Sequence, residues 1–447
     1  MLLALNRWLK GASRKSPNRR NQNRSTFQLL KLEERTTPAI AAALASGPGI
    51  ISRVDVLDEN GTVLTSFQPY QNSFLGGVNV ALADVTGDGV LDIITGAGYS
   101  SYFPNFLGGP HVQVFDGAGL LGGNDRPLHS FFPYAQNFTG GVFVAGGDLD
   151  GDGFADVVCG QGEGGTSQVT AWKFDNATFE PIQRMLSFTG FTNPDNVTPF
   201  VGGVRVACAD FGGDNGGIAG SRTAGDAEIV LVPGPGGGPL VRLFDYANLL
   251  NPNLPLEFNP DNYGNFYAQF GIDNNYRGSF YVAGGYFTAN RDGDGFIYAD
   301  IVISAGGGSL NVPIDGGSPH VLTYRLDGFF SPDRLSGATY ILANEPPGID
   351  DDTGLPENVT PNSFAYSFFP FDLDFHGGIS VGVITVPASN TSNATDNIIV
   401  GTGPNIIPPP GVALPPTVKI YDGFTGAILN EFTAFGDPNF NGGVVVA

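Results

Sequence analysis

The chain has 447 residues and a formal net charge of −22, and it contains 66 Gly, 33 Pro and 35 Phe. Its basic residues gather at the start: residues 1–35 carry a charge of +7 and the remainder carries −29. So acidic a surface disfavours nucleic acid and anionic membranes as partners. Because the sequence has no apolar run of about 18 residues, we expect no membrane span.

Residues 1–46 are predicted to be a basic, disordered export or targeting segment. The run LKLEERTTPA, from Leu30 to Ala39, resembles the L-E-x-R-x-x-P segment near the start of many planctomycete-type exported and cell-surface proteins. This resemblance implies a secreted or cell-surface bacterial protein. A disordered basic tail without a targeting role, or an arm that binds nucleic acid, is the alternative.

Six copies of a short strand sequence organise the rest of the chain. We call this sequence the anchor; its copies are GGVNVA from Gly76, GGVFVA from Gly140, GGVRVA from Gly202, GSFYVA from Gly278, GGISVG from Gly377 and GGVVVA from Gly442. The steps between successive copies are 64, 62, 76, 99 and 65 residues. A recurring period of this size predicts a repeat architecture.

The first full repeat, residues 76–139, contains four segments whose pattern predicts β-strands. The segments are Gly76–Ala81, Asp92–Gly96, Val112–Asp116 and Leu128–Tyr134. Four short strands with turns between them make one blade of a β-propeller. The sequence F-x-P-Y-x-x-x-F, at Phe67–Phe74 and Phe131–Phe138, is expected to pack between blades, with a sugar-stacking shelf as the alternative.

Residues 47–447 are therefore predicted to form one all-β propeller of four-stranded blades. Residues 47–70 match the later strands of a blade, and the sequence finishes on a lone first strand, Gly442–Ala447. Pairing of these two segments completes a blade and closes the ring, which removes exposed sheet edges. This count gives six blades; a degenerate blade within the 99-residue step would give seven.

Acidic loops follow the first predicted strand in two repeats. In GGVFVAGGDLDGDGFAD the acids occupy loop positions 1, 3, 5 and 9, and a glycine follows the third acid. Carboxylates at alternate positions of a tight loop can converge on one hard cation, and Ca²⁺ takes about six to eight oxygens. The predicted ligands are Asp148, Asp150, Asp152, Phe154 (through its carbonyl) and Asp156, and in the preceding repeat Asp84, Thr86, Asp88, Val90 (through its carbonyl) and Asp92.

The acidic loops of the later repeats differ. The fourth repeat predicts a third calcium site, formed by Asn290, Asp292, Asp294, Phe296 and Asp300. In the third repeat an insertion separates Asp210 and Asp214 from Asp226 and Glu228, which leaves metal binding open, and the fifth repeat is expected to be metal-free. Acidic turns without a metal are the alternative throughout.

This combination resembles the FG-GAP repeat and the related VCBS repeat, as found in the head of the integrin α-subunit. Phe74 with Gly76-Gly77, and Phe138 with Gly140-Gly141, correspond to the F-G at the start of a blade, and Gly96-Ala97-Gly98 to the G-A-P, with Gly98 in place of proline. The resemblance covers about residues 49–447. It implies a β-propeller with calcium in the loops between strands one and two.

The sequence contains no nucleophile-elbow, zinc-protease, P-loop or dinucleotide motif, and no catalytic residue is assigned. We therefore expect a monomeric calcium-binding module that recognises a glycan or a surface protein, with the metal holding its loops. A polysaccharide-degrading lyase or hydrolase is one alternative, because paired acids cannot be recognised from sequence alone; a structural cell-envelope protein is another. Long insertions at residues 248–275 and 345–362 are expected to be solvated surface loops, and ligand-binding loops are the alternative.

Overall fold

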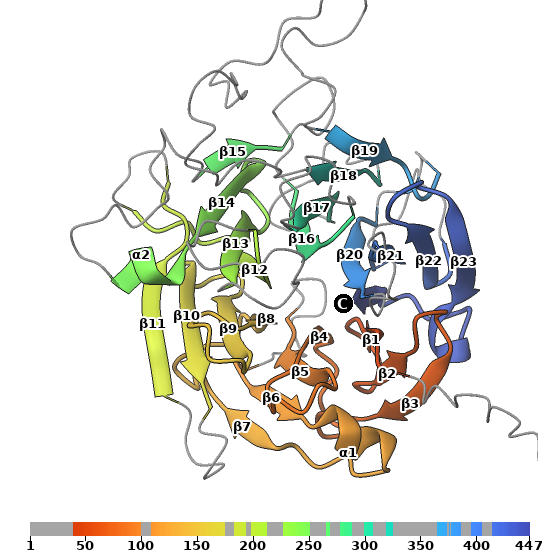
Figure 1. Ribbon diagram of the computed structural model, residues 1–447, viewed down its shortest axis with the longest axis horizontal. Coiled ribbons are helices and arrows are strands. Elements are labelled where there is room, and N and C mark those ends of the chain that lie inside the picture. Colours follow the sequence, from red (N-terminus) through yellow and green to blue (C-terminus); the bar gives the residue numbers. More distant parts are fainter. Residues whose placement is uncertain are drawn as a thin grey trace, which may run out of the picture. The chain divides into compact units, whose positions relative to one another are not determined.

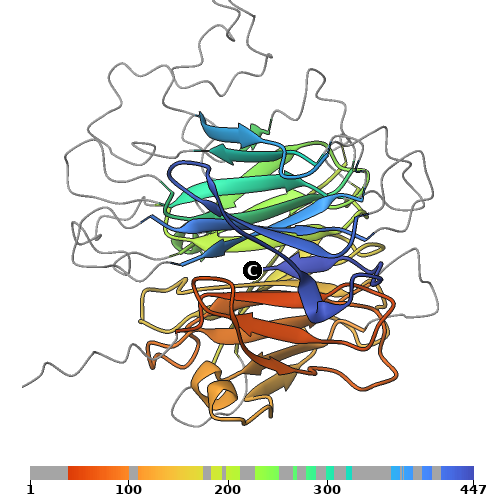
Figure 2. The ribbon, with the colours of Figure 1, turned by 90° about the vertical axis from the view of Figure 1, so that its right-hand side faces the viewer.

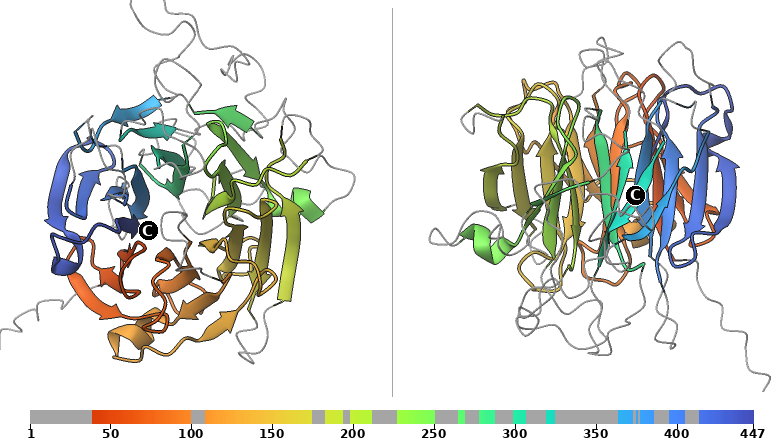
Figure 3. Two further views of the ribbon diagram at one scale, coloured as in Figure 1. Left: turned by 180° about the vertical axis from the view of Figure 1, so that it is seen from behind. Right: turned by 90° about the horizontal axis from the view of Figure 1, so that it is seen from above.

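The computed structural model describes residues 39–99, 109–174, 183–193, 198–211, 227–250, 265–268, 278–287, 299–306, 319–324, 364–372, 375, 377–385, 395–404 and 414–447. Its strands form six four-stranded antiparallel sheets. The sheets stand around a common centre, with one strand of each nearest to it (Figure 1). Figures 2 and 3 show from the side that the strands run between the two faces of the ring. The protein is a six-bladed β-propeller, as predicted.

Blades 1 to 5 follow one another along the chain. Blade 1 contains β4 (Val78–Ala83), β5 (Asp92–Ala97), β6 (Val112–Phe115) and β7 (His129–Phe131); blade 2 contains β8 (Val142–Gly147), β9 (Asp156–Gln161), β10 (Gln168–Lys173) and β11 (Gln183–Thr189). Blade 3 contains β12 (Val204–Ala209), β13 (Glu228–Pro233), β14 (Leu240–Phe244) and β15 (Asn265–Tyr267). Blade 4 contains β16 (Phe280–Gly285), β17 (Asp300–Ala305), β18 (Val321–Tyr324) and β19 (Phe364–Phe368); blade 5 contains β20 (Ile379–Ile384), β21 (Asn397–Thr402), β22 (Thr417–Asp422) and β23 (Ile428–Thr433).

The sixth, closing blade combines both ends of the propeller in the order β24 (Val444–Val446), β1 (Ala42–Ser46), β2 (Val54–Leu57) and β3 (Val63–Phe67). Strand β24 pairs with β1, with Val445 opposite Ala45, which confirms the predicted closure. The predicted start of the propeller at residue 47 is too late, because β1 precedes it and is buried along its whole length. Its sequence, AALAS, lacks the β-branched residues that would have marked it as a strand.

Short helices occur outside the blades. Helix α1 (Gly117–Leu121) follows β6, helix α2 (Tyr246–Leu250) follows β14, and a 3₁₀ helix (Ala434–Gly436) follows β23. The side chain of Asp116 caps α1 by accepting a hydrogen bond from the backbone N–H of Gly119. No helix in the described part of the chain combines the length and apolar character that a membrane crossing requires.

The glycine pair of the anchor is explained by contact between blades. The second glycine has a positive φ, 84° at Gly77 and 75° at Gly141, a conformation that residues with a Cβ rarely adopt. A Cβ on Gly77 would also lie 2.8 Å from the backbone nitrogen of Pro48 in the closing blade. At Gly77 and Gly141 the second glycine therefore lets the first strand begin directly against the preceding blade, whereas the fourth anchor has Ser279 at this position.

The hydrophobic core lies between neighbouring blades. In one of its clusters, Ile94 and Val112 of blade 1 pack with Val142 and Val157 of blade 2. Strands β5, β9, β13 and β17 are buried at every position because neighbours cover both of their faces. The hydroxyl of Tyr134, in the segment after β7, donates to the carbonyl of Cys159 in blade 2 at 2.6 Å, which confirms that the F-x-P-Y sequence packs between blades.

Candidate metal centre

The loop between β8 and β9 is a tight turn formed by the second predicted calcium sequence. Gly151 and Gly153 have φ values of 70° and 88°, which permit the sharp reversal. The carboxylate of Asp148 accepts hydrogen bonds from the backbone N–H groups of Asp152, at 3.1 Å, and Gly153, at 2.8 Å. The first acid of the loop thus braces the turn that presents the other acids.

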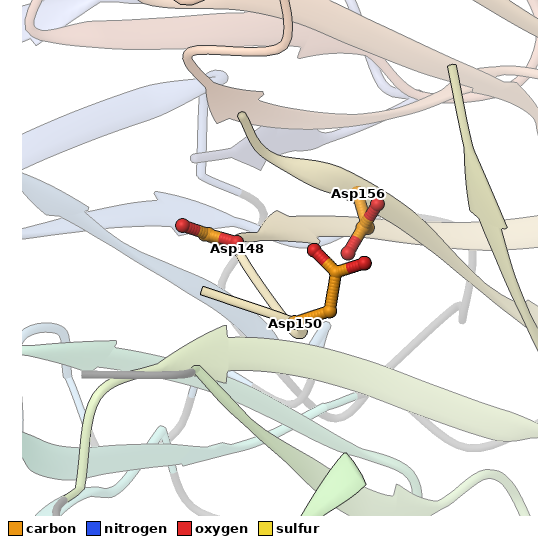
Figure 4. A group of neighbouring side chains, drawn as sticks. All are labelled: Asp148, Asp150 and Asp156. Carbon is orange, nitrogen blue, oxygen red and sulfur yellow. The ribbon is translucent and has the colours of Figure 1, made fainter. Parts of the chain in front are cut away.

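Three of the predicted ligands come together in this loop. Asp148, Asp150 and Asp156 each offer a carboxylate oxygen, and these atoms lie within 4.8 Å of one another. The carboxylates of Asp150 and Asp156 point toward each other (Figure 4). Two oxygens that bind one Ca²⁺ lie at most about 5 Å apart, because each is about 2.3–2.6 Å from the ion. The three acids therefore fit a shared cation.

Asp156 is the buried member of the three and opens β9. Burial raises the pKa of its carboxyl group to about 7; the Leu149 N–H, which donates to it at 3.1 Å, lowers the pKa, and the charges of Asp150 and Asp148 raise it. A carboxyl group with such a pKa is partly protonated near neutral pH. A bound cation would favour its ionised form.

A lysine that the sequence analysis missed lies against this loop. The ammonium group of Lys173, at the end of β10, forms ion pairs with Asp150 and with Asp152, the latter at 2.6 Å. Partial burial lowers the pKa of Lys173, but its contacts with the two carboxylates raise the pKa by more than burial lowers it. The net shift is upward, so the ammonium stays charged. The signal was present in the repeat: at the equivalent position, at or directly after the end of the third strand, four of the other five blades have an aspartate, namely Asp58, Asp116, Asp245 and Asp422.

The loop between β4 and β5 differs from the loop between β8 and β9 in the hydrogen bonds of its last acid. Asp92 is fully buried and accepts hydrogen bonds from the backbone N–H groups of Val85, Thr86 and Gly117 at 2.8–2.9 Å. Burial raises its pKa to about 6, although the N–H groups of Gly117 and Thr86 lower it. With both of its oxygens engaged, Asp92 ties the loop to the start of α1.

The remaining acids of this first loop also bond to their own backbone. Asp84 accepts from the N–H groups of Gly87, Asp88 and Gly89, and Asp88 accepts from Val90 at 2.8 Å. Among the described residues, Asp148, Asp150 and Asp156 are the only group of three His, Cys, Asp or Glu side chains that approach as closely as a shared ion requires. Metal binding by Asp84, Thr86, Asp88, Val90 and Asp92 stays a prediction.

The third predicted site lies mostly outside the described residues, which include neither Asn290, Asp292, Asp294 nor Phe296. Its last member, Asp300, opens β17, is fully buried and accepts a hydrogen bond from the Phe287 N–H at 3.2 Å. Glu228, at the same position in blade 3, accepts from the Phe211 N–H at 2.7 Å. An acid that opens the second strand therefore braces the preceding loop in several blades.

Neighbouring acidic loops are joined by backbone hydrogen bonds. The carbonyl of Asp84 accepts from Ala155 N–H at 2.9 Å, and the carbonyl of Asp148 accepts from Ala227 N–H at 2.6 Å. A Cβ on Gly87 would lie 2.3 Å from the ring of Phe154, so this ring covers the first loop. Each of these two loops is thus in direct contact with the corresponding loop of the next blade.

Comparisons with known proteins give structural similarity at low sequence identity. No protein-family model matches the chain, and no curated protein matches it. It is similar to an exotype rhamnogalacturonan lyase, YesX, with 11% identity and a TM-score of 0.32, over 88% of this chain and 57% of that one. It is similar to a second rhamnogalacturonan lyase, YesW, with 10% identity and a TM-score of 0.32, over 64% of this chain and 48% of that one.

A rhamnogalacturonan lyase from Bacillus licheniformis is also similar, with 11% identity and a TM-score of 0.30, over 92% of this chain and 73% of that one. The chain spans about half the length of the first two lyases. Similarity at these TM-scores carries no inference about substrate or activity.

Proposed function

We propose that this chain is an exported, calcium-binding β-propeller that acts as a binding or adhesion module. The observation that carries the metal assignment is the approach of Asp148, Asp150 and Asp156 within 4.8 Å. Their donor atoms are all carboxylate oxygens, which suit hard cations such as calcium. Calcium also tolerates the irregular arrangement of a short loop, whereas magnesium demands a near-octahedral one.

The metal is proposed to hold the structure together. Asp148 already binds the N–H groups of its own turn, and its carbonyl accepts a hydrogen bond from Ala227 of the next blade. A cation shared by Asp148, Asp150 and Asp156 would neutralise their mutual repulsion and fix the loop against β9. Chemistry on a substrate is not required by this arrangement.

The partner is proposed to be an extracellular glycan or a surface protein. Export is supported by the LKLEERTTPA segment, and the acidic surface argues against nucleic acid. The insertions at residues 248–275 and 345–362 are the proposed recognition loops, since long loops on a rigid scaffold often carry binding function. Most of their residues lie outside the described ranges.

The metal assignment is tested by calcium titration of the full chain and of Asp150→Asn, with Asp125→Asn as the control because Asp125 is exposed and outside both acidic loops. We expect a dissociation constant of about 0.1–1 mM, as in extracellular modules, and a loss of binding at this site only in Asp150→Asn. Equal binding by both variants would refute the site. Retention on a glycan or surface-protein array in calcium, lost in chelator, would test the module function.

A further inference from the structure

A cavity of about 490 Å³ lies at the centre of the ring and is lined by the first strands of all six blades. Its wall is mostly alanine, glycine and valine. A second cavity of about 130 Å³ is lined in part by glycines that begin four of the anchors, namely Gly76, Gly77, Gly140, Gly202, Gly442 and Gly443. The residues that line both cavities include the fourth anchor residue of five blades, namely Asn79, Phe143, Arg205, Tyr281 and Val445.

Arg205 is the one cation in this group. Its guanidinium carbon lies 4.7 Å from the ring centre of Phe143 and 4.1 Å from that of Tyr281, an arrangement that holds the planar group by cation–π attraction. Arg205 is only 9% exposed. No carboxylate of the described residues forms an ion pair with it, although the chain has a net charge of −22.

One edge of the guanidinium is used within the protein and another is not. The Nη1 group donates to the carbonyl of Phe280 at 2.9 Å and so joins blade 3 to blade 4. The Nε group is buried and has no hydrogen-bond partner among the described residues. A buried donor left unpaired is costly, and such groups are uncommon in native structures.

The unused edge is the one that binds carboxylates. Elsewhere in this protein Arg53 binds both oxygens of Asp55 through Nε, at 2.7 Å, and Nη2, at 3.1 Å. Paired, parallel hydrogen bonds of this kind are the geometry in which arginine recognises a carboxylate most strongly. The contact of Arg205 with Phe280 uses Nη1, and the buried Nε has no hydrogen-bond partner among the described residues.

We propose that the larger central cavity binds a small monocarboxylate with an apolar body, whose carboxylate is held by the guanidinium group of Arg205. The alanine and valine wall of the larger cavity accommodates the apolar body, as in most small-molecule sites. Asp84, Asp148, Asp210 and Asp396 also line that cavity. These four carboxylates outnumber Arg205 and repel an anion more strongly the more negative groups it carries, so the ligand carries one negative group at most, placed against Arg205.

The first experiment uses benzoate as the probe and benzamide as its neutral isostere, on the full chain, by saturation-transfer NMR and thermal shift. We expect benzoate to bind and benzamide to bind at least about tenfold more weakly, because only benzoate offers two charged acceptors to the arginine. Absence of benzoate binding, or equal binding of the two compounds, would overturn the proposal.

The second experiment compares Arg205→Lys with Arg242→Lys. Lysine keeps the charge and removes the paired donors, so benzoate should bind about tenfold more weakly to Arg205→Lys. Arg242 is a matched control, since it too lies near aromatic rings and donates to a carbonyl, yet lines neither cavity. Unchanged affinity in a folded Arg205→Lys would contradict the proposal. If that variant does not fold, the comparison of benzoate with benzamide on the native chain decides.

Discussion

Replacing Lys173 with methionine should increase the affinity of the second acidic loop for calcium. The ammonium of Lys173 contacts Asp150, one of the three acids proposed to share the ion, and Asp152 beside it. A calcium ion on Asp150 must displace this ammonium. Lys173 is therefore an internal competitor that partly neutralises the loop while no metal is bound.

The size of the expected gain in calcium affinity follows from how exposed the two ion pairs of Lys173 are. The side chains of Lys173, Asp150 and Asp152 are 31%, 26% and 37% exposed. Ion pairs in water-accessible positions contribute about 0.2–1 kcal/mol each, so the two together contribute about 1 kcal/mol. Removing that competition should tighten calcium binding about fivefold, since about 1.4 kcal/mol corresponds to a factor of ten. The metal-free variant should be less stable by a similar amount.

Calorimetric titration with calcium and denaturant unfolding in chelator would measure the two effects. Lys419→Met is the control, because Lys419 pairs with Glu431 at 3.4 Å between β22 and β23, away from the acidic loops. The control should leave calcium affinity unchanged. If Lys173→Met bound calcium no more tightly than the native chain, the shared use of Asp150 by lysine and metal would be refuted.

Three further predictions concern pH, the anchor glycines and ring closure. The pKa of Asp156 is raised to about 7 in the metal-free fold, so calcium affinity should fall below neutral pH, by up to about tenfold per pH unit. Calcium titrations at several pH values measure this effect. In Asp156→Asn the calcium affinity should not change with pH over this range. Because the folded pKa exceeds the unfolded one, ionisation of Asp156 costs stability, and unfolding in chelator should become easier as pH rises from about 4 to about 7. Gly141→Ala should lower the free energy of unfolding, measured with denaturant, more than Gly123→Ala does. Both glycines have positive φ, which costs an alanine about 1–2 kcal/mol of strain, but only at Gly141 would the added Cβ lie close to backbone atoms, at 2.9 Å. A chain shortened by residues 442–447 loses two buried valines of β24, at about 1.5–3 kcal/mol each; a melting temperature equal to that of the full chain would mean that β24 does not close the ring.

Much of the fold could be predicted because each blade repeats the same local signals. The anchors mark the first strands, and the second glycine that five of them carry reflects, as at Gly77, a close approach that a Cβ would obstruct. Strand β1 was placed outside the propeller because Ala42–Ser46 is stabilised by β24, hundreds of residues away, rather than by its own propensity. Local sequence does not report such a partner.

The candidate metal centre was only partly predictable. The spacing of acids indicated Asp148, Asp150 and Asp156 correctly as neighbours. Spacing did not reveal that Asp92, at the position equivalent to Asp156, has both oxygens bound to backbone N–H groups, because one donor, Gly117, comes from a different turn. Nor did it reveal Lys173, which reaches the loop from β10 through the pairing of strands.

Thermal unfolding of the full chain in calcium and in chelator, with bound metal counted, tests the central claim most directly. With a dissociation constant of about 0.1 mM and about 1 mM calcium, each site should add about 1.4 kcal/mol to the free energy of unfolding. We expect a higher melting temperature in calcium and at least one bound ion, which Asp150→Asn removes. An unchanged melting temperature with no bound metal would show that the loop from Asp148 to Asp156 is an acidic turn held by its backbone hydrogen bonds and by Lys173.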